Sequence, residues 1–184
     1  LLPAAAAASA MVTVNTVVIV QGDLGLGERE TTIALVAFGI GTATGALAAP
    51  TLLARIGLRA TTLSGAFAIA VVLLAGTAAG GYAALLALWA LLGAAAALVQ
   101  LTLTAFTREN AHRGAVDATF AGGLVLWNLA LVAGNAIAGW TGAAAGSGVA
   151  FAILAAIAAV SALAAALGWP PAATRATLER KTAE

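Results

Sequence analysis

The sequence predicts an all-α membrane protein that crosses the bilayer as six helices. Of its 184 residues, 62% are hydrophobic and only 8% are charged, whereas a soluble domain carries roughly 25% charged residues. Apolar stretches of roughly 20 residues recur along the chain, and each is long enough to cross the hydrocarbon core of a membrane as a helix. When these stretches are read as six spans, every basic residue except Arg29 falls on one side of the membrane.

The six spans follow one another with short connections. Their expected limits are about 3–21, 31–53, 60–78, 82–106, 116–140 and 147–169. The connections without charge are rich in glycine, and Pro170 and Pro171 end the last span because proline cannot continue the helical hydrogen-bond ladder. Residues 1–169 are therefore expected to form a six-helix transmembrane bundle, and residues 170–184 a cytoplasmic tail.

The basic residues give the bundle an orientation. Those on the shared side are Arg55, Arg59, Arg108, Arg113, Arg175, Arg180 and Lys181. Because spanning proteins keep Lys and Arg in cytoplasmic loops, this side is expected to be cytoplasmic, and the C-terminus to lie there. Alanine outnumbers isoleucine and arginine outnumbers lysine, which suggests a GC-rich bacterial genome and hence a multi-pass protein of the inner membrane.

The composition excludes several classes of site and partner. The chain has no cysteine, and its single histidine, His112, is too little for a histidine-based metal site or a catalytic triad. We therefore expect no metal, no cofactor and no enzymatic activity. Ser64 in the third span has no histidine in any span to activate it as a protease nucleophile. A net charge of +1 gives no reason to expect a nucleic-acid partner, and His112 is better explained as a solvated loop residue than as a proton relay.

The chain begins with leucine inside an apolar run, so it is expected to be a fragment of a longer protein. The triplet Ala8, Ser9, Ala10 resembles a signal-peptide cleavage site. However, no positively charged region precedes it, and the apolar run continues to Val20. A transmembrane span is therefore the preferred interpretation of these residues.

Amide side chains within the spans are the candidate substrate contacts, because amides in hydrocarbon are costly unless paired or wet. They fall in the first, fourth and fifth spans and are absent from the third and sixth: Asn15, Gln100, Asn128 and Asn135. Trp127 lies beside Asn128 near the middle of the fifth span, and we expect this pair to line a central cavity. The alternative for each amide is a plain hydrogen bond between helices.

Glycine spacing predicts close helix packing. In the second span Gly41 and Gly45 are four residues apart, and Gly134 and Gly139 lie in the fifth span. Glycine allows the backbone of another helix to approach. Such spacing is common by chance in an alanine-rich chain, so close packing is preferred over a role in gating.

The segment from Ala49 to Arg59 carries a resemblance to a known family. Its Arg55, Gly57 and Arg59 match the pattern Gly-x-x-x-Asp-Arg-x-Gly-x-Arg, with Pro50 in the Gly place and Ala54 in the Asp place. This pattern resembles the short cytoplasmic loop of the major facilitator superfamily, in the copy found in the second half. The glycines of the second span resemble the family's eighth helix, and the segment from Asn128 to Gly134, followed by Gly139, resembles its eleventh helix in the drug-efflux-like branches.

The resemblance covers the whole chain as helices seven to twelve. It implies half of a twelve-helix fold, built from two inverted three-helix repeats, that works with a missing N-terminal half of six helices. The family's loop carboxylate and arginines help to hold the cytoplasmic side closed. Ala54 replaces the carboxylate, so we expect this loop to act only as a weak latch, that is, to hold the cytoplasmic side closed only weakly. An equal explanation is that Arg55 and Arg59 only anchor the loop on the cytoplasmic side, as the positive-inside rule predicts.

The function implied by the resemblance is secondary transport of a small molecule by alternating access. Efflux of a neutral or amphipathic compound is favoured by the resemblance to the drug-efflux-like branches. The absence of Lys and Arg within the spans argues that this half does not bind an anionic substrate. Coupling to protons normally needs an ionisable group in the membrane, so the coupling residues are expected in the missing half. The alternative is a non-transporting six-helix scaffold or a degenerate half-transporter.

Overall fold

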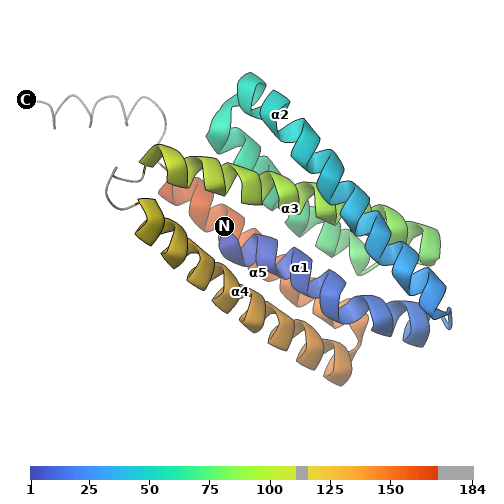
Figure 1. Cartoon of the computed structure of the whole chain (residues 1–184). Coiled ribbons are helices and arrows are strands. Elements are labelled where there is room, and N and C mark those ends of the chain that lie inside the picture. Colours follow the sequence, from blue (N-terminus) through green and yellow to red (C-terminus); the bar gives the residue numbers. More distant parts are fainter. Residues whose placement is uncertain (111–115, 170–184) are drawn as a thin grey trace, which may run out of the picture.

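The computed structural model describes residues 1–110 and 116–169, and all its regular elements are helical. They are α1 (Leu2–Val17), a π-helical segment η1 (Val18–Asp23), α2 (Glu28–Gly76), α3 (Tyr82–Asn110), α4 (Val116–Ala145) and α5 (Ser147–Gly168). Five stretches, with η1 continuing α1, are long and apolar enough to cross a membrane. Figure 1 shows them packed side by side as one bundle.

The longest helix, α2, is two antiparallel legs joined at a single residue. Its 49 residues would extend about 74 Å if straight, more than twice the roughly 30 Å hydrocarbon core. The backbone leaves the helical region only at Gly57, with φ 79° and ψ 168°, a conformation open to glycine because it lacks a Cβ. The chain reverses there, so the first leg (28–56) and the second leg (58–76) run in opposite directions (Figure 1).

The reversal at Gly57 corrects the expected loop of residues 54–59. Helical structure continues to the glycine from both sides, so the two expected spans meet at one residue instead of being joined by a loop. The other differences are at helix ends: α1 passes into the π-helical η1, and α4 continues to Ala145, beyond the expected limit at 140.

Helix α1 lies in the interior of the bundle, and α4 is the most exposed helix. Alanines dominate the buried side of α1 from Ala4 to Ala10, and their small side chains allow neighbouring helices to approach closely. The exposed surface of α4 is apolar, with Leu124, Leu129 and Val132 among its outward side chains. An apolar outer surface is suited to lipid or to another apolar protein surface.

The predicted packing glycines lie at two helix crossings. In the first, a Cβ at Gly41 or Gly45 would overlap the backbone of α3 at Ala90 or Ala94. In the second, between α4 and α1, a Cβ at Gly134 would lie 3.2 Å from Ala10 Cβ. The remaining predicted packing glycine, Gly139, has only an ordinary contact, 3.5 Å to a methyl of Val14.

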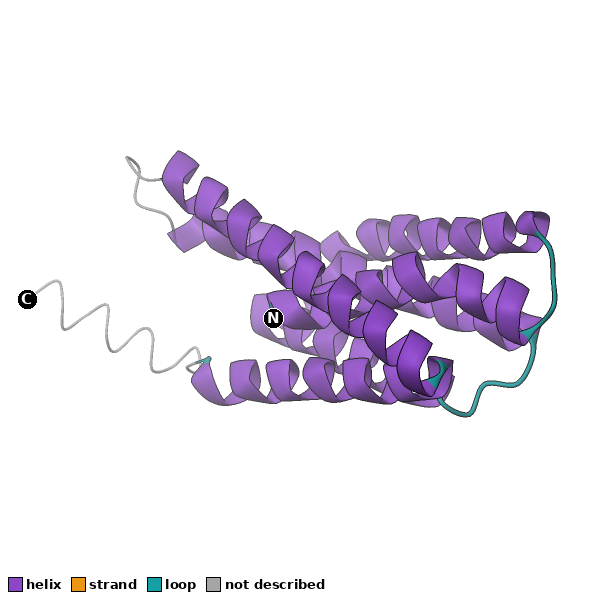
Figure 2. Ribbon diagram, turned by 90° about the horizontal axis from the view of Figure 1, so that it is seen from below, coloured by secondary structure: helices purple, strands orange, loops and turns teal. Residues whose placement is uncertain are grey.

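Hydrogen bonds join neighbouring helices at the end of the bundle that carries the loops 24–27 and 77–81 (Figure 2). Gln21 Nε2 donates to Thr31 Oγ1 at 3.2 Å, and the Tyr82 hydroxyl donates to the Glu30 carbonyl at 2.7 Å. Ser147 Oγ, at the start of α5, donates to the Asp23 carboxylate at 2.7 Å. These contacts connect η1, α2, α3 and α5 at one end.

Candidate functional site

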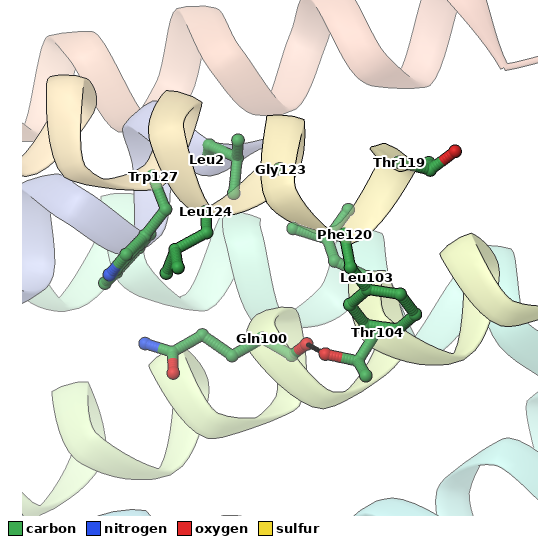
Figure 3. A pocket seen from close by; sticks show the side chains of 9 residues that line it. All are labelled: Leu2, Gln100, Leu103, Thr104, Thr119, Phe120, Gly123, Leu124 and Trp127. Carbon is green, nitrogen blue, oxygen red and sulfur yellow. Dashed lines mark hydrogen bonds between the residues drawn. The ribbon is translucent and has the colours of Figure 1, made fainter. Parts of the chain in front are cut away.

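A pocket of about 250 Å³ lies between α3 and α4, beside the first residues of α1 (Figure 3). Its lining residues are Leu2, Gln100, Leu103, Thr104, Thr119, Phe120, Gly123, Leu124 and Trp127. Apart from Leu2 of α1, they come from the C-terminal half of α3 and the N-terminal half of α4. The pocket therefore lies away from the end at which loops 24–27 and 77–81 connect the helices.

Helical periodicity brings these side chains together. Gln100, Leu103 and Thr104 are three and four residues apart on α3, so they share one face. On α4 the same spacing relates Phe120 to Gly123, Leu124 and Trp127. A Cβ built on Gly123 would meet no atom within 4 Å, so the glycine widens the pocket without being required by packing.

The pocket combines aromatic and aliphatic walls with uncharged polar groups. The side-chain amide of Gln100 extends into the gap between α3 and α4 (Figure 3), and makes no hydrogen bond within the part of the chain that the structure describes. The Thr104 hydroxyl donates to the backbone carbonyl oxygen of Gln100 at 2.9 Å. None of the lining residues is Asp, Glu, Lys, Arg or His. The pocket therefore suits an uncharged molecule with an apolar surface and at least one hydrogen-bonding group.

Asn15 lies away from this pocket, buried between α1 and α4. Its Nδ2 donates to the carbonyl oxygen of Ala138 at 3.4 Å, and Gly142 leaves the space that its Oδ1 occupies. The placement favours the alternative explanation for this amide, a hydrogen bond between helices.

A second buried polar contact, which the sequence analysis did not anticipate, adjoins Asn15. The Trp89 indole Nε1 of α3 donates to Thr16 Oγ1 of α1 at 2.8 Å, and both side chains are fully buried. The Trp89 ring also packs against Phe151 of α5, with 5.9 Å between ring centroids. The sequence did show a tryptophan in the middle of a span beside small residues, which could have suggested a buried contact. Nothing in the sequence identified Thr16 as its partner.

The two asparagines of α4 have different surroundings. Asn128 is exposed, and its Nδ2 donates to the Leu124 carbonyl of its own helix at 2.8 Å. Asn135 is half-buried, and its Oδ1 is buried with no hydrogen-bond partner among the described residues. Of the five predicted contacts, the pocket thus brings together only Gln100 and Trp127.

The predicted loop motif lies at the reversal of α2. Arg55 is exposed, Gly57 makes the turn, and Arg59 is half-buried. The Arg59 Nη2 donates to the Ala166 carbonyl near the end of α5 at 2.9 Å, where a cation is favoured by the negative end of the helix dipole. His112 and the other basic residues expected on the cytoplasmic side fall outside the residues whose side chains the structure describes.

Comparison with known families shows which family the chain belongs to. The sequence profile of the Major Facilitator Superfamily matches the chain over residues 1–184. No curated protein and no solved structure matches it. With its apolar spanning helices, the chain is a multi-pass membrane protein that belongs to the major facilitator superfamily, a family of small-molecule transporters.

Proposed function

We propose that the chain is the C-terminal half of a twelve-helix secondary transporter, which exports a neutral or amphipathic compound by alternating access. The observation that carries this proposal is the uncharged pocket holding Gln100 and Trp127 between α3 and α4. A pocket with apolar walls and a few convergent polar groups is the usual form of a small-molecule site. In this proposal, α1 with its continuation η1 is helix seven, and the two legs of α2 are helices eight and nine. Helices ten to twelve are α3, α4 and α5.

The glycine crossings support an arrangement of two inverted three-helix repeats. The first repeat would be α1 with the two legs of α2, and the second α3, α4 and α5. The first leg crosses α3 at Gly41 and Gly45, and α4 crosses α1 at Gly134 and Gly142. The second helix of each repeat thus crosses the first helix of the other, as repeats related by a two-fold axis require.

The proposed orientation follows from charge. Arg55 and Arg59 lie at the reversal of α2, whereas Asp23, Glu28 and Glu30 lie near the loop that precedes α2. Under the positive-inside rule the reversal and the tail 170–184 are cytoplasmic, in a bacterial inner membrane. Residues 1–169 form the bundle, and any coupling to protons depends on the other half, because no ionisable residue lies in the middle of these spans.

Substitutions in the pocket test the proposal in the full-length protein. We expect Trp127→Ala and Gln100→Leu each to reduce transport of a neutral aromatic compound about tenfold, because each removes a contact of the order of 1–1.5 kcal/mol. Transport is measured in vesicles with an imposed proton gradient, over a panel of candidate compounds. Leu129→Ala, on the exposed side of α4, is the control and should transport normally.

The same assay decides whether Asn128 belongs to the site. The cavity hypothesis expects Asn128→Leu to change transport or substrate range without affecting membrane insertion. Unchanged kinetics in Asn128→Leu would restrict the site to Gln100 and Trp127. If Trp127→Ala and Gln100→Leu also transported at the control rate, the pocket would have no role, and the alternative of a non-transporting scaffold would be favoured.

Arg55 tests the latch at the cytoplasmic side. Its side chain is exposed and makes no hydrogen bond within the described part of the chain, and Ala54 supplies no carboxylate beside it. If Arg55 pairs with the other half when the cytoplasmic side is closed, Arg55→Ala shifts the balance toward the inward-open state by about threefold to fivefold, the value of one weak ion pair. Accessibility labelling of cysteines placed on each side of the membrane measures this balance, and unchanged labelling would favour simple anchoring.

A further inference from the structure

Arg59 presents a guanidinium group whose hydrogen-bonding capacity is mostly unused. Of its five N–H donors, only one on Nη2 has a partner among the described residues, the Ala166 carbonyl at 2.9 Å. Its Nε is buried and unpaired. The hydrogen bond to Ala166 fixes the side chain between the second leg of α2 and the end of α5. The guanidinium group is thus held in place, and its other N–H groups have no partner among the described residues.

No described carboxylate can pair with this group. The sequence contains no Asp or Glu between Glu30 and Glu109. Glu30 lies at the start of the first leg of α2, and the reversal near Arg59 follows almost a whole leg later, a separation of about 40 Å along the helix. The described carboxylates of Asp23, Glu28 and Glu30 are therefore at the wrong end of the bundle.

A second guanidinium group lies at the same end of α2. Arg55 is two residues before the turn at Gly57, and Arg59 is two residues after it. The turn therefore puts both cations at one tip of the bundle. Arg55 is exposed and has no hydrogen bond within the described ranges 1–110 and 116–169.

The chemistry and position of this pair fit a phosphate group. Guanidinium binds phosphate through paired N–H donors with matching geometry. A tip at the end of a spanning hairpin lies at the level of the lipid headgroups, and the cytoplasmic leaflet is the one that carries anionic lipid. We propose that Arg59, with Arg55, binds the phosphate of an anionic phospholipid in the cytoplasmic leaflet.

The proposed lipid has a structural effect. A phosphate bound at Arg59 joins the turn of α2 to the end of α5 through a side chain that already contacts Ala166. The site rests on the proposed orientation, and not on the substrate pocket or on transport. Binding is therefore measured without a transport assay, so that failure of the proposed function and failure of this site can be told apart.

The test is lipid retention by the purified full-length protein in detergent, measured by native mass spectrometry during titration. The probes are phosphatidylglycerol and phosphatidylcholine with identical acyl chains. We expect phosphatidylglycerol to be retained in preference, and Arg59→Gln and Arg55→Gln each to weaken its apparent affinity about fivefold, the value of one basic residue near a lipid surface. Arg29→Gln, an exposed arginine at the other end of the bundle, should bind as the wild type does.

Several results would overturn the site. Equal retention of the two lipids, or Arg59→Gln and Arg55→Gln indistinguishable from Arg29→Gln, would mean that another group, such as a carboxylate of the protein itself, satisfies the arginines. Loss of phosphatidylglycerol on addition of millimolar inorganic phosphate would assign the site to the free anion instead of a lipid. If Arg59→Gln did not fold, Arg55→Gln would decide alone, because Arg55 makes no hydrogen bond in the described structure.

Discussion

Gly41→Ala is expected to lower the free energy of unfolding by about 1–3 kcal/mol, the usual cost of inserting a methyl group into a closely packed interface. A Cβ at position 41 would overlap the carbonyl oxygen of Ala90, and that oxygen belongs to the backbone of α3. A backbone atom cannot rotate away as a side chain can, so the first leg of α2 and α3 must separate. Unfolding of the purified protein in increasing SDS, followed by circular dichroism, measures the change.

Gly39→Ala is the matched control for that prediction. It makes the same chemical change on the same leg, two residues away, where an added Cβ meets nothing within 4 Å. Alanine is favoured over glycine in a helix by about 1 kcal/mol, so this variant should be as stable as the wild type or more so. Equal stability of Gly41→Ala and Gly39→Ala would contradict the close crossing of α2 and α3.

Trp89→Ala is expected to cost about 3–5 kcal/mol, the range for removing a large buried aromatic side chain. The substitution removes a fully buried ring that packs against Phe151 and donates to Thr16. It therefore leaves a cavity where α1, α3 and α5 meet, and an unpaired hydroxyl beside it. Trp89→Phe keeps most of the packing and loses the hydrogen bond, and should cost about 1 kcal/mol.

The control for Trp89 is the exposed tryptophan of α4. Trp140 is 79% exposed, so Trp140→Ala removes the same side chain without opening a cavity and should change the unfolding free energy little. The same SDS titration compares the two variants. A Trp89→Ala protein as stable as Trp140→Ala would mean that the contact between α1 and α3 does not hold the bundle together.

Sequence reasoning located the helices well because length and hydropathy determine which segments can span a membrane. The limits expected for the spans agree with α3 and α5 to within a few residues. The turn at Gly57 was expected as a loop, because the two arginines and the glycine read as polar loop chemistry. A reversal at one residue depends on a backbone conformation, and hydropathy does not report it.

The site was harder to predict, because polarity alone does not tell which neighbour satisfies an amide. Asn15 and Gln100 are both amides within spans, yet Asn15 donates to another helix and Gln100 extends into a pocket. The difference comes from Gly142 and Ala138, which are more than 120 residues away from Asn15 along the chain. Pairings of that kind arise from tertiary packing and leave no local pattern in the sequence.

The π-helical segment η1 affects which directions the side chains at the end of α1 point. A π-helix carries an extra residue relative to the α-helical repeat, so the residues that follow are turned by about 100° about the helix axis. Gln21 and Asp23 lie within this segment, where Gln21 donates to Thr31 and Asp23 accepts a hydrogen bond from Ser147. Deleting one residue between Val18 and Val20 would restore a regular helix and rotate both polar side chains away from their partners. The widened turn thus sets the angular register by which α1 meets α2 and α5 at that end of the bundle.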